Sequence, residues 1–288
     1  MRMDNYKFQK IIKPSIVSAI KEDIGSGDLT TNILVPSKLL GTAIILVKEN
    51  CILGGVEVCK TICELIDKKL VIKLFFNDGD EIAQNTTVAT IKGPVKSILK
   101  AERLILNYMQ RMSGIATKTH HYCILIKDYK VKLLDTRKTT PNFRLFEKWA
   151  VRIGGGVNHR FGLYDEILIK DNHIEANNNI LNTLEKLNQY LSTSRGNRKK
   201  IIVEIKNKNE FIIANKYPFV DRILIDNLPP FEVKKLVQLN SSKKALEVSG
   251  GINMNNVKKY AATGVDYISV GELTHHINSI DISLNLQQ

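Results

Sequence analysis

The spacing of hydrophobic positions changes along the chain of 288 residues and predicts two regions of different architecture. In the first region, residues 41–55 and 69–82 are runs rich in Ile, Val and Phe, which is typical of strands. Between them, residues 56–67 (VEVCKTICELID) place apolar side chains at helical spacing. Residues 87–99 predict another strand, with a Gly-Pro break. This part of the chain therefore predicts a mixed unit of helices and strands.

Two helical segments are predicted on either side of these strands. Residues 15–24 follow Pro14 and precede Gly25, so we expect proline in the first turn of a helix that ends at the glycine. Residues 99–128 also have a helical pattern, which a Ser-Gly pair interrupts at residues 113–114. Because such a pair favours a break, we expect two helices there, joined at a domain boundary.

Six apolar runs follow, each ending in polar or glycine residues. Continuous Ile, Leu and Val runs are typical of parallel strands that are covered on both faces. The last four runs are roughly twenty residues apart, about what a strand, a loop and a helix require. The second region is therefore predicted to be a β/α barrel or a relative of one. The runs are KLLDTRK (132–138), EILIKDN (166–172), IIVEIKN (201–207), RILIDN (222–227), LEVSGG (246–251) and YISVGE (267–272).

The residues just after these runs are candidate site residues, because the carboxyl ends of the strands form the active site of a β/α barrel. They are Arg137, Lys138, Lys170, Asp171, Glu204, Lys206, Asp226, Asn227, Ser249 to Gly251, Gly271 and Glu272. His159 and Arg160, which follow three consecutive glycines, are added as candidates. One phosphate would not require all of the cations in this set, and arginine side chains bind planar carboxylates as well as phosphates. We therefore expect two anionic ligands in one pocket.

The two glycine turns, VSGGI and SVGE, predict a phosphate site. They follow the last two strands, where barrel enzymes commonly bind phosphate through backbone N–H groups and the amino end of a helix. The glycines at 154–156 indicate something different, because His159 occupies the place of the last glycine in the dinucleotide-binding pattern. A dinucleotide-binding fold is therefore not expected.

Glu204 and Asp226 are expected to end adjacent strands and to face a polyphosphate. Two carboxylates in that position are suited to Mg²⁺, which bridges phosphate oxygens and is usually bound by one or two carboxylates and water. The alternative is a structural ion pair of these acids with Lys170, Lys206 or Arg222.

The formal net charge of +13 makes an anionic partner plausible. A nucleic acid is not expected, because the basic stretches KNKNE and RGNRKK are short and contain no aromatic residues. No membrane span is expected, since no run approaches eighteen apolar residues, and the first residues lack a secretory signal. We therefore expect a cytoplasmic protein.

The four cysteines contain no CxxC pair. Cys59 and Cys63 are four residues apart, as core positions on one helix face would be. A metal site at the cysteines is therefore not expected.

Several strings together resemble quinolinate phosphoribosyltransferase, also called carboxylating nicotinate-nucleotide pyrophosphorylase. The longest is DTRKTTPNFRLFEKWAVRIGGGVNHRFGLYDEILIKDNHI, and EDIGSGDLTT, AERLILNYMQRMSGIATKT, EVSGGI and SVGELTH lie around it in the same order as in the family. The resemblance runs from about residue 14 to residue 276.

The resemblance implies an α/β fold with an N-terminal α/β sandwich domain and an incomplete, seven-stranded-type β/α barrel. The corresponding limits are residues 1–112 for the sandwich domain, 113–275 for the barrel domain, and 276–288 for a tail that returns to the first domain. The resemblance also implies a homodimer in which the sandwich domain of one subunit closes the barrel of the other. Arg103 would be supplied across that interface.

The resemblance further implies transfer of phosphoribosyl from phosphoribosyl pyrophosphate to quinolinate with loss of CO₂, a step of NAD biosynthesis that uses Mg²⁺. Arg103, Arg137, His159 and Arg160 match the residues that bind the quinolinate carboxylates, with Lys138 and Lys170 between the two substrates. Glu204 and Asp226 match the pair that faces the ribose and the metal, and the four residues Lys138, Lys170, Glu204 and Asp226 are the expected catalytic set. The remaining expected substrate contacts are Thr136, Ser249, Gly250, Gly251, Val270, Gly271 and Glu272.

Two other functions remain as alternatives. A related barrel phosphoribosyltransferase for nicotinate or another planar acid would use the same architecture, although several cations on the acid side favour a dicarboxylate. A basic nucleic-acid-binding protein would show steep salt dependence. In the EDIGSGDLTT loop, Asp28 is expected to form a turn and cap the next segment rather than contact substrate.

Overall fold

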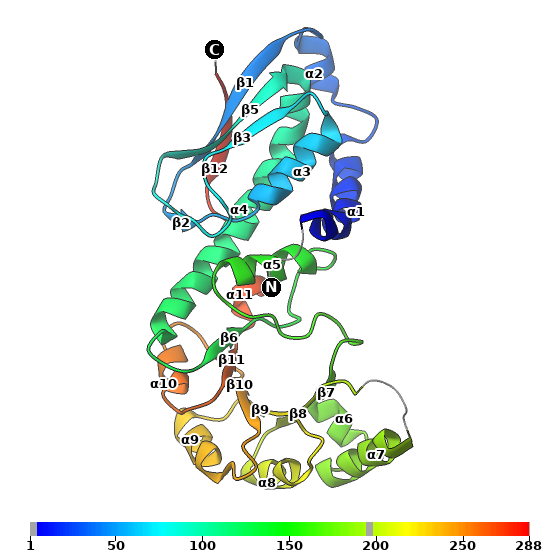
Figure 1. The fold of residues 1–288 in the computed structure, drawn as a ribbon, viewed down its shortest axis with the longest axis vertical. Coiled ribbons are helices and arrows are strands. Elements are labelled where there is room, and N and C mark those ends of the chain that lie inside the picture. Colours follow the sequence, from blue (N-terminus) through cyan, green and yellow to red (C-terminus); the bar gives the residue numbers. More distant parts are fainter. Residues whose placement is uncertain (1–4, 194–197, 288) are drawn as a thin grey trace. The chain divides into compact units, whose positions relative to one another are not determined.

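The computed structural model describes residues 5–193 and 198–287 (Figure 1). The chain divides into two compact units. The first comprises Met1–His120, Thr139–Gly155 and His276–Gln288, and the second comprises His121–Lys138 and Gly156–His275. The main sheet of the first unit is antiparallel, and the sheet of the second is parallel.

The sheet of the first unit has the strand order β12-β1-β5-β3. Its strands are β1 (Leu40–Val47), β3 (Val71–Leu74), β5 (Thr86–Pro94) and β12 (Ile282–Gln287), and the shorter β2 (Cys51–Ile52) and β4 (Glu81–Ile82) pair separately. β12 pairs with β1 from Thr42↔Gln287 to Val47↔Ile282, so segments from opposite ends of the sequence lie side by side (Figure 1). The tail of the chain thus belongs to the first unit.

The helices of this unit begin with α1 (Asn5–Ile24), which differs from the expectation at its start. Pro14 lies inside the helix and not in its first turn, while the end before Gly25 is as predicted. A proline inside a helix removes one backbone hydrogen bond. Ile12 and Ile16 on either side are fully buried, so packing of the apolar face holds the helix together across the proline.

Asp28 caps α2 (Leu29–Leu34), as predicted. Its Oδ1 accepts a hydrogen bond of 2.9 Å from the Thr31 backbone N–H. Hydrogen bonds from the Thr31 side chain and backbone lower the pKa of Asp28, so the cap is a charged carboxylate at the positive end of the helix. Asp28 therefore has a local structural role as the N-cap of α2.

The predicted pair of helices over residues 99–128 is wrong, because α4 (Val95–Ile126) is one helix of 32 residues. Its Ser-Gly pair serves close packing. Ser113 Oγ accepts from the Gly54 backbone N–H at 3.0 Å and donates to the Gly54 carbonyl at 3.2 Å. A Cβ on Gly114 would lie 2.2 Å from the Asn278 carbonyl oxygen. Small residues here let other backbone segments approach the helix.

The remaining helices of the first unit are α3 (Val56–Ile66) and α5 (Arg144–Ile153). α5 lies in residues 139–155, which the predicted limits assign to the barrel domain. Contacts place this segment in the first unit. The Phe146 ring packs on Tyr108 of α4 with centroids 4.7 Å apart, and Glu147 pairs with Arg111 at 2.6 Å.

The second unit contains all six predicted parallel strands, in the order β6-β11-β10-β9-β8-β7. They are β6 (Lys132–Leu134), β7 (Ile167–Ile169), β8 (Ile201–Ile205), β9 (Arg222–Asp226), β10 (Ala245–Ser249) and β11 (Tyr267–Ser269). Beyond β6, Val157 makes a single parallel bridge to Leu134. In the part of the chain that the structure describes, this bridge stands where a seventh strand of the expected barrel would continue the sheet.

Helices follow the strands of the second unit, as the spacing of the apolar runs predicts. They are α6 (Asp171–Glu175), α7 (Ile180–Thr193), α8 (Lys208–Lys216), α9 (Pro230–Leu239), α10 (Val257–Ala261) and α11 (Glu272–His275). All five residues of β8 are buried, which is what a strand covered on both faces requires. Leu168, Ile202 and Leu224 from three adjacent strands form a buried cluster.

The cysteines are free, and Cys59 and Cys63 are buried on α3, as predicted. The hydrogen bond between Cys59 and Cys63, together with burial, raises the pKa of Cys59, which keeps it a neutral thiol. No helix among residues 5–193 and 198–287 is long and apolar enough to span a bilayer.

Candidate active site

A cavity of about 790 Å³ opens at the carboxyl ends of the parallel strands of the second unit. Most predicted site residues line it: Thr136, Arg137, Lys138, His159, Arg160, Lys170, Glu204, Asp226, Ser249, Gly250, Gly251, Gly271 and Glu272. Three candidates do not. Val270 is only 1% exposed and does not line the cavity, Lys206 is exposed outside it, and Arg103 lies exposed on α4 in the first unit.

Arg137 and Arg160 make one part of the cavity strongly cationic. Arg160 is only 6% exposed, and its Nη1 donates to the Glu166 carbonyl at 3.0 Å. Its Nε is buried without a hydrogen-bond partner among the residues that the structure describes. Burial, followed by the nearby charge of Arg137, lowers the pKa of Arg160. Two neighbouring guanidinium groups, one of them buried, create a site that an anion would stabilise.

The loop that carries His159 is fixed by a buried acid at the end of β6. Asp135 accepts from the His159 backbone N–H at 2.8 Å and from Asn158 Nδ2 at 2.6 Å. The His159 Nδ1 accepts from the Arg160 backbone N–H at 2.7 Å. This hydrogen bond assigns the ring proton of neutral His159 to Nε2.

Glu247, which the sequence analysis did not select, is the other acid that faces His159. It lies in the middle of β10, is fully buried, and its Oε1 is 3.4 Å from His159 Nε2. Its Oε2 accepts from Arg222 Nη1 at 2.8 Å, and Ser269 Oγ donates to its Oε1 at 2.5 Å. Burial by itself would raise the pKa of Glu247, but His159, Arg222 and Ser269 together lower it.

Of the two predicted metal-facing acids, Glu204 forms the ion pair that was the alternative. Its Oε2 is 2.7 Å from Lys170 Nζ, and the glutamate side chain is nearly buried. The other two possible partners are engaged elsewhere, since Lys206 pairs with Asp171 at 2.8 Å and Arg222 with Glu247. Asp226, on the neighbouring strand, accepts from Asn227 Nδ2 at 2.7 Å. Glu204 and Asp226 thus both line the cavity from adjacent strands, as predicted.

The turn after β10 requires glycine at one position. Gly250 has a φ of 95°, in the left-handed region, and a Cβ there would lie 2.2 Å from Asn227 Oδ1. Asn227 also has a positive φ of 56° and donates its backbone N–H to the Ser249 carbonyl at 2.9 Å. The ends of β9 and β10 are therefore tightly packed together. Gly250 and Gly251, which have no side chains, line the cavity at this turn.

The turn after β11 leads directly into α11. A Cβ on Gly271 would lie 2.9 Å from Lys138 Cδ, so glycine allows the lysine to cross this turn. Glu272 lines the cavity, and its carboxylate accepts a hydrogen bond from the buried Tyr122 hydroxyl. The Thr274 hydroxyl donates to the Lys138 carbonyl at 2.7 Å, which joins this turn to the one after β6.

Glu204 and Asp226 are carboxylates that could hold a Mg²⁺ ion together with a polyphosphate ligand. In the described ranges there is no group of three or more His, Cys, Asp or Glu side chains that could hold a metal alone. Glu204 and Asp226 supply carboxylate oxygens, and Mg²⁺ commonly takes its other ligands from phosphate and water.

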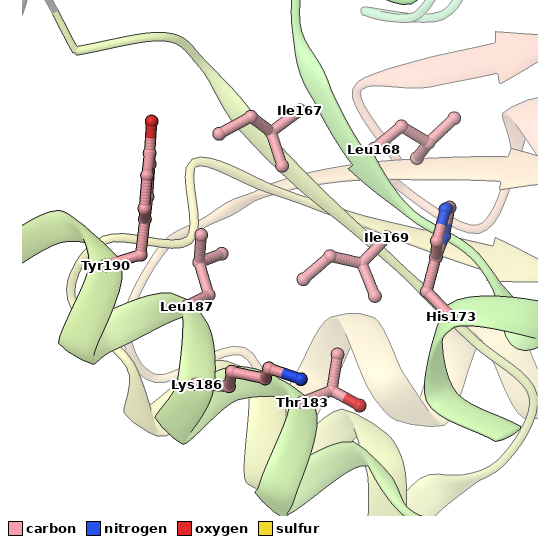
Figure 2. A pocket seen from close by; sticks show the side chains of 8 residues that line it. All are labelled: Ile167, Leu168, Ile169, His173, Thr183, Lys186, Leu187 and Tyr190. Carbon is pink, nitrogen blue, oxygen red and sulfur yellow. The ribbon is translucent and has the colours of Figure 1, made fainter. Parts of the chain in front are cut away.

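A second, shallower hollow of about 290 Å³ lies between β7 and α7 (Figure 2). Its lining is mainly apolar, with Ile167 and Ile169 from the strand and Leu187 and Tyr190 from the helix. Its polar groups already have partners: Lys186 Nζ is 3.3 Å from Asn177 Oδ1, and His173 Nδ1 accepts from the Lys170 backbone N–H. We therefore assign the candidate active site to the larger cavity, where most of the predicted site residues lie.

The fold and the cavity are those of a β/α-type enzyme that gathers several cationic side chains at the carboxyl ends of its parallel strands. Models of quinolinate phosphoribosyl transferase match residues 28–113 (N-terminal domain) and 115–285 (C-terminal domain). The chain therefore belongs to the quinolinate phosphoribosyltransferase family.

Individual relatives agree with this assignment. The chain is 41% identical to the probable nicotinate-nucleotide pyrophosphorylase [carboxylating] of Bacillus subtilis, over 92% of this chain and 90% of that protein. It is 36% identical to the mitochondrial quinolinate phosphoribosyltransferase [decarboxylating] 2a of Nicotiana tabacum, over 93% and 80%. The solved nicotinate-nucleotide pyrophosphorylase of Francisella tularensis superposes with a TM-score of 0.89 at 39% identity, covering 97% of each chain.

Proposed function

We propose that this chain transfers the phosphoribosyl group of phosphoribosyl pyrophosphate to quinolinate and releases nicotinate mononucleotide, pyrophosphate and CO₂, as a step of NAD biosynthesis. The observation that carries this proposal is the buried Arg160 beside Arg137, in a cavity that Lys138, Lys170, Glu204 and Asp226 also line. Such a cavity suits a planar dicarboxylate next to a phosphorylated sugar.

The cations bind and orient quinolinate. Arg137 and Arg160 receive its carboxylates, and His159 lies beside them in the same wall of the cavity. Holding both carboxylates directs the ring nitrogen at C1 of the ribose and reduces the entropy cost of the bimolecular step. Lys138 and Lys170 lie between the acid and the phosphoribosyl donor, where they screen the repulsion between two anionic substrates.

Glu204 and Asp226 act on the ribose. The bond from C1 to the leaving pyrophosphate breaks as the ring nitrogen of quinolinate attacks, so positive charge develops on the sugar and the carboxylates stabilise it. Glu204 and Asp226 would also hold Mg²⁺, which would supply positive charge to the leaving pyrophosphate. The resulting pyridinium draws electrons from the adjacent carbon, which loses its carboxylate as CO₂ and takes up a proton. The backbone at Ser249 to Gly251 and at Gly271 receives the 5-phosphate.

We also propose that the enzyme is a cytoplasmic homodimer in which Arg103 of one subunit serves the other subunit's site. Arg103 is exposed on α4. The apolar face of α2 supports an additional contact between subunits, because Leu29 and Ile33 are 77% and 79% exposed. Sedimentation of the intact protein and mixing of an inactive Arg103→Ala subunit with an inactive Arg160→Ala subunit test this. Recovery of activity on mixing is the expected result, and no recovery from a mixed dimer contradicts it.

The activity is tested by measuring CO₂ release and nicotinate mononucleotide formation from quinolinate, phosphoribosyl pyrophosphate and Mg²⁺. The wild-type chain is compared with Arg160→Ala and with a reaction that contains no metal. Metal-dependent product that is lost in the variant supports the proposal. The absence of turnover by a folded dimer would contradict the proposed activity. Turnover of nicotinate but not quinolinate favours the related transferase, and salt-steep binding to DNA or RNA favours the nucleic-acid alternative.

A further inference from the structure

The buried Glu247 presents a physical problem for an anion-binding site. A carboxylate that lines a cavity for anionic ligands repels them unless its charge is neutralised. Arg222, only 5% exposed, supplies that charge at 2.8 Å from Oε2, and its guanidinium carbon lies 4.0 Å from the centre of the Tyr267 ring. The other oxygen, Oε1, remains directed at His159 and Ser269.

These contacts leave the His159 ring only one orientation. Nδ1 accepts from the Arg160 backbone N–H at 2.7 Å, so Nε2 carries the proton of the neutral ring and points at Glu247 Oε1, 3.4 Å away. The backbone N–H of His159 is held by Asp135. Because the ring accepts a hydrogen bond from Arg160, a change in the ring angle also moves the backbone from which the Arg160 guanidinium extends.

We propose that Glu247 is a positioning residue for quinolinate: it fixes the Nε2–H form and the angle of His159, and through His159 the place of Arg160. This inference rests on the proposed function for its kinetic test. Glu247 itself does not touch the dicarboxylate. Arg222 neutralises it, and Ser269 holds the oxygen that faces His159.

Glu247→Gln keeps the shape of the side chain and removes the carboxylate that orients His159. We expect the KM for quinolinate to rise about tenfold, the size of effect found when the partner that orients a functional histidine is removed. The KM for phosphoribosyl pyrophosphate is expected to change by less than about twofold, since the Glu247 side chain is directed at His159, Arg222 and Ser269, while the 5-phosphate is assigned to the backbone of residues 249–251. Ser269→Ala, which leaves the carboxylate in place, gives a smaller change of the same kind.

The main competing explanation is that Glu247 only stabilises the fold through its ion pair with Arg222. Removing one partner of a buried pair leaves an uncompensated charge, so Glu247→Gln alone can lower stability or prevent folding. The double variant Arg222→Met/Glu247→Gln removes both charges. If Glu247 positions His159, the double variant folds and still has the raised KM for quinolinate. If its role is only structural, the double variant recovers the wild-type KM together with stability.

A matched control is Asp221→Asn. Asp221 is also a carboxylate paired with an arginine in the second unit, but it precedes β9 and accepts from the Ile201 backbone N–H at the opposite ends of the strands. Removing its charge is expected to affect stability without changing either KM. A rise in the KM for quinolinate in this control would attribute the Glu247 effect to a general loss of stability and overturn the inference.

A measurement that does not need turnover separates this inference from the proposed function. Long-range ¹⁵N–¹H NMR of the histidine rings, assigned with His159→Gln, reports which nitrogen carries the proton. We expect the Nε2–H form for His159 in the wild-type protein and a mixture in Arg222→Met/Glu247→Gln. The Nδ1–H form in the wild type, or an unchanged His159 signal in the double variant, would overturn the inference. An inactive wild type with the expected signals would contradict only the proposed function.

Discussion

Replacing Arg160 with methionine is expected to lower kcat/KM for quinolinate strongly and to make the folded protein more stable. Arg160 is 6% exposed, its Nε has no hydrogen-bond partner among the described residues, and the charge of Arg137 lies nearby. In the proposed function, this buried cation receives a carboxylate of the substrate. Methionine has a similar length and carries no charge.

The expected magnitudes follow from these contacts. A guanidinium fork on a carboxylate makes two charge-assisted hydrogen bonds, and losing them costs roughly 3 to 4 kcal/mol, or about 10²- to 10³-fold in kcat/KM for quinolinate. In the free protein, methionine loses one hydrogen bond to the Glu166 carbonyl, worth about 1 kcal/mol. It also removes a buried charge that lies near Arg137 and that Glu166 and Asp165 compensate only in part, and such a charge costs several kcal/mol. The free energy of unfolding is therefore expected to rise by about 1 to 2 kcal/mol.

The assay combines steady-state kinetics with urea unfolding of the same preparations. Arg198→Met is the control, because Arg198 is an exposed arginine that pairs with Asp221 and should change both quantities little. If Arg160→Met unfolds at lower urea than the wild type while kcat/KM for quinolinate is retained, Arg160 stabilises the fold and the assignment of the acid-binding site is wrong.

Three other changes test separate features of the structure. Burial raises the pKa of Asp78 from 3.8 to about 6, so its contribution to stability is full below the lower value and is lost as pH rises through about 6. Asp78→Asn should therefore gain about 2 kcal/mol in stability relative to the wild type between pH 4 and pH 7.5. Urea midpoints of the two proteins that move in parallel with pH would refute this. Gly114→Ala should destabilise the protein by about 2 kcal/mol or more, seen as a lower Tm, because its Cβ would meet the Asn278 carbonyl oxygen at 2.2 Å. Glu204→Gln should lower kcat by about 10²-fold with little change in the free energy of unfolding. The substitution removes the charge that pairs with Lys170 and that, in the proposed mechanism, stabilises positive charge on the ribose. An unchanged kcat would exclude a role of Glu204 in stabilising the transition state.

The periodicity of the sequence was sufficient to predict the six parallel strands, because each is a short apolar run whose burial on both faces leaves few alternatives. Their carboxyl ends then located most of the candidate site. The errors occurred where tertiary packing overrides local preference. Pro14 lies within a helix that Ile12 and Ile16 hold in place, and the pair at residues 113–114 lies within the continuous α4.

Glu247 was missed because strand ends alone were considered. An acid between Leu246 and Val248 in a buried run is costly unless it is paired, which is a signal in the sequence itself. Its partner Arg222 begins the preceding strand, but only the register of β9 and β10 brings the two side chains together. The division of the chain also depends on contacts that no local pattern reveals, since residues 139–155 join the first unit through Tyr108 and Arg111.

The pairing of β12 with β1 has a consequence for folding during synthesis on the ribosome. β1 lies between β12 and β5 in the sheet, yet its partner residues 282–287 are translated more than two hundred residues after residues 42–47. Until then, the nascent first unit exposes the unpaired edge of a strand that contains the apolar sequence AIILV, a template for association with other chains. Completion of this sheet must therefore follow translation, while the second unit, whose strands are neighbours in sequence from β7 to β11, can begin to assemble earlier.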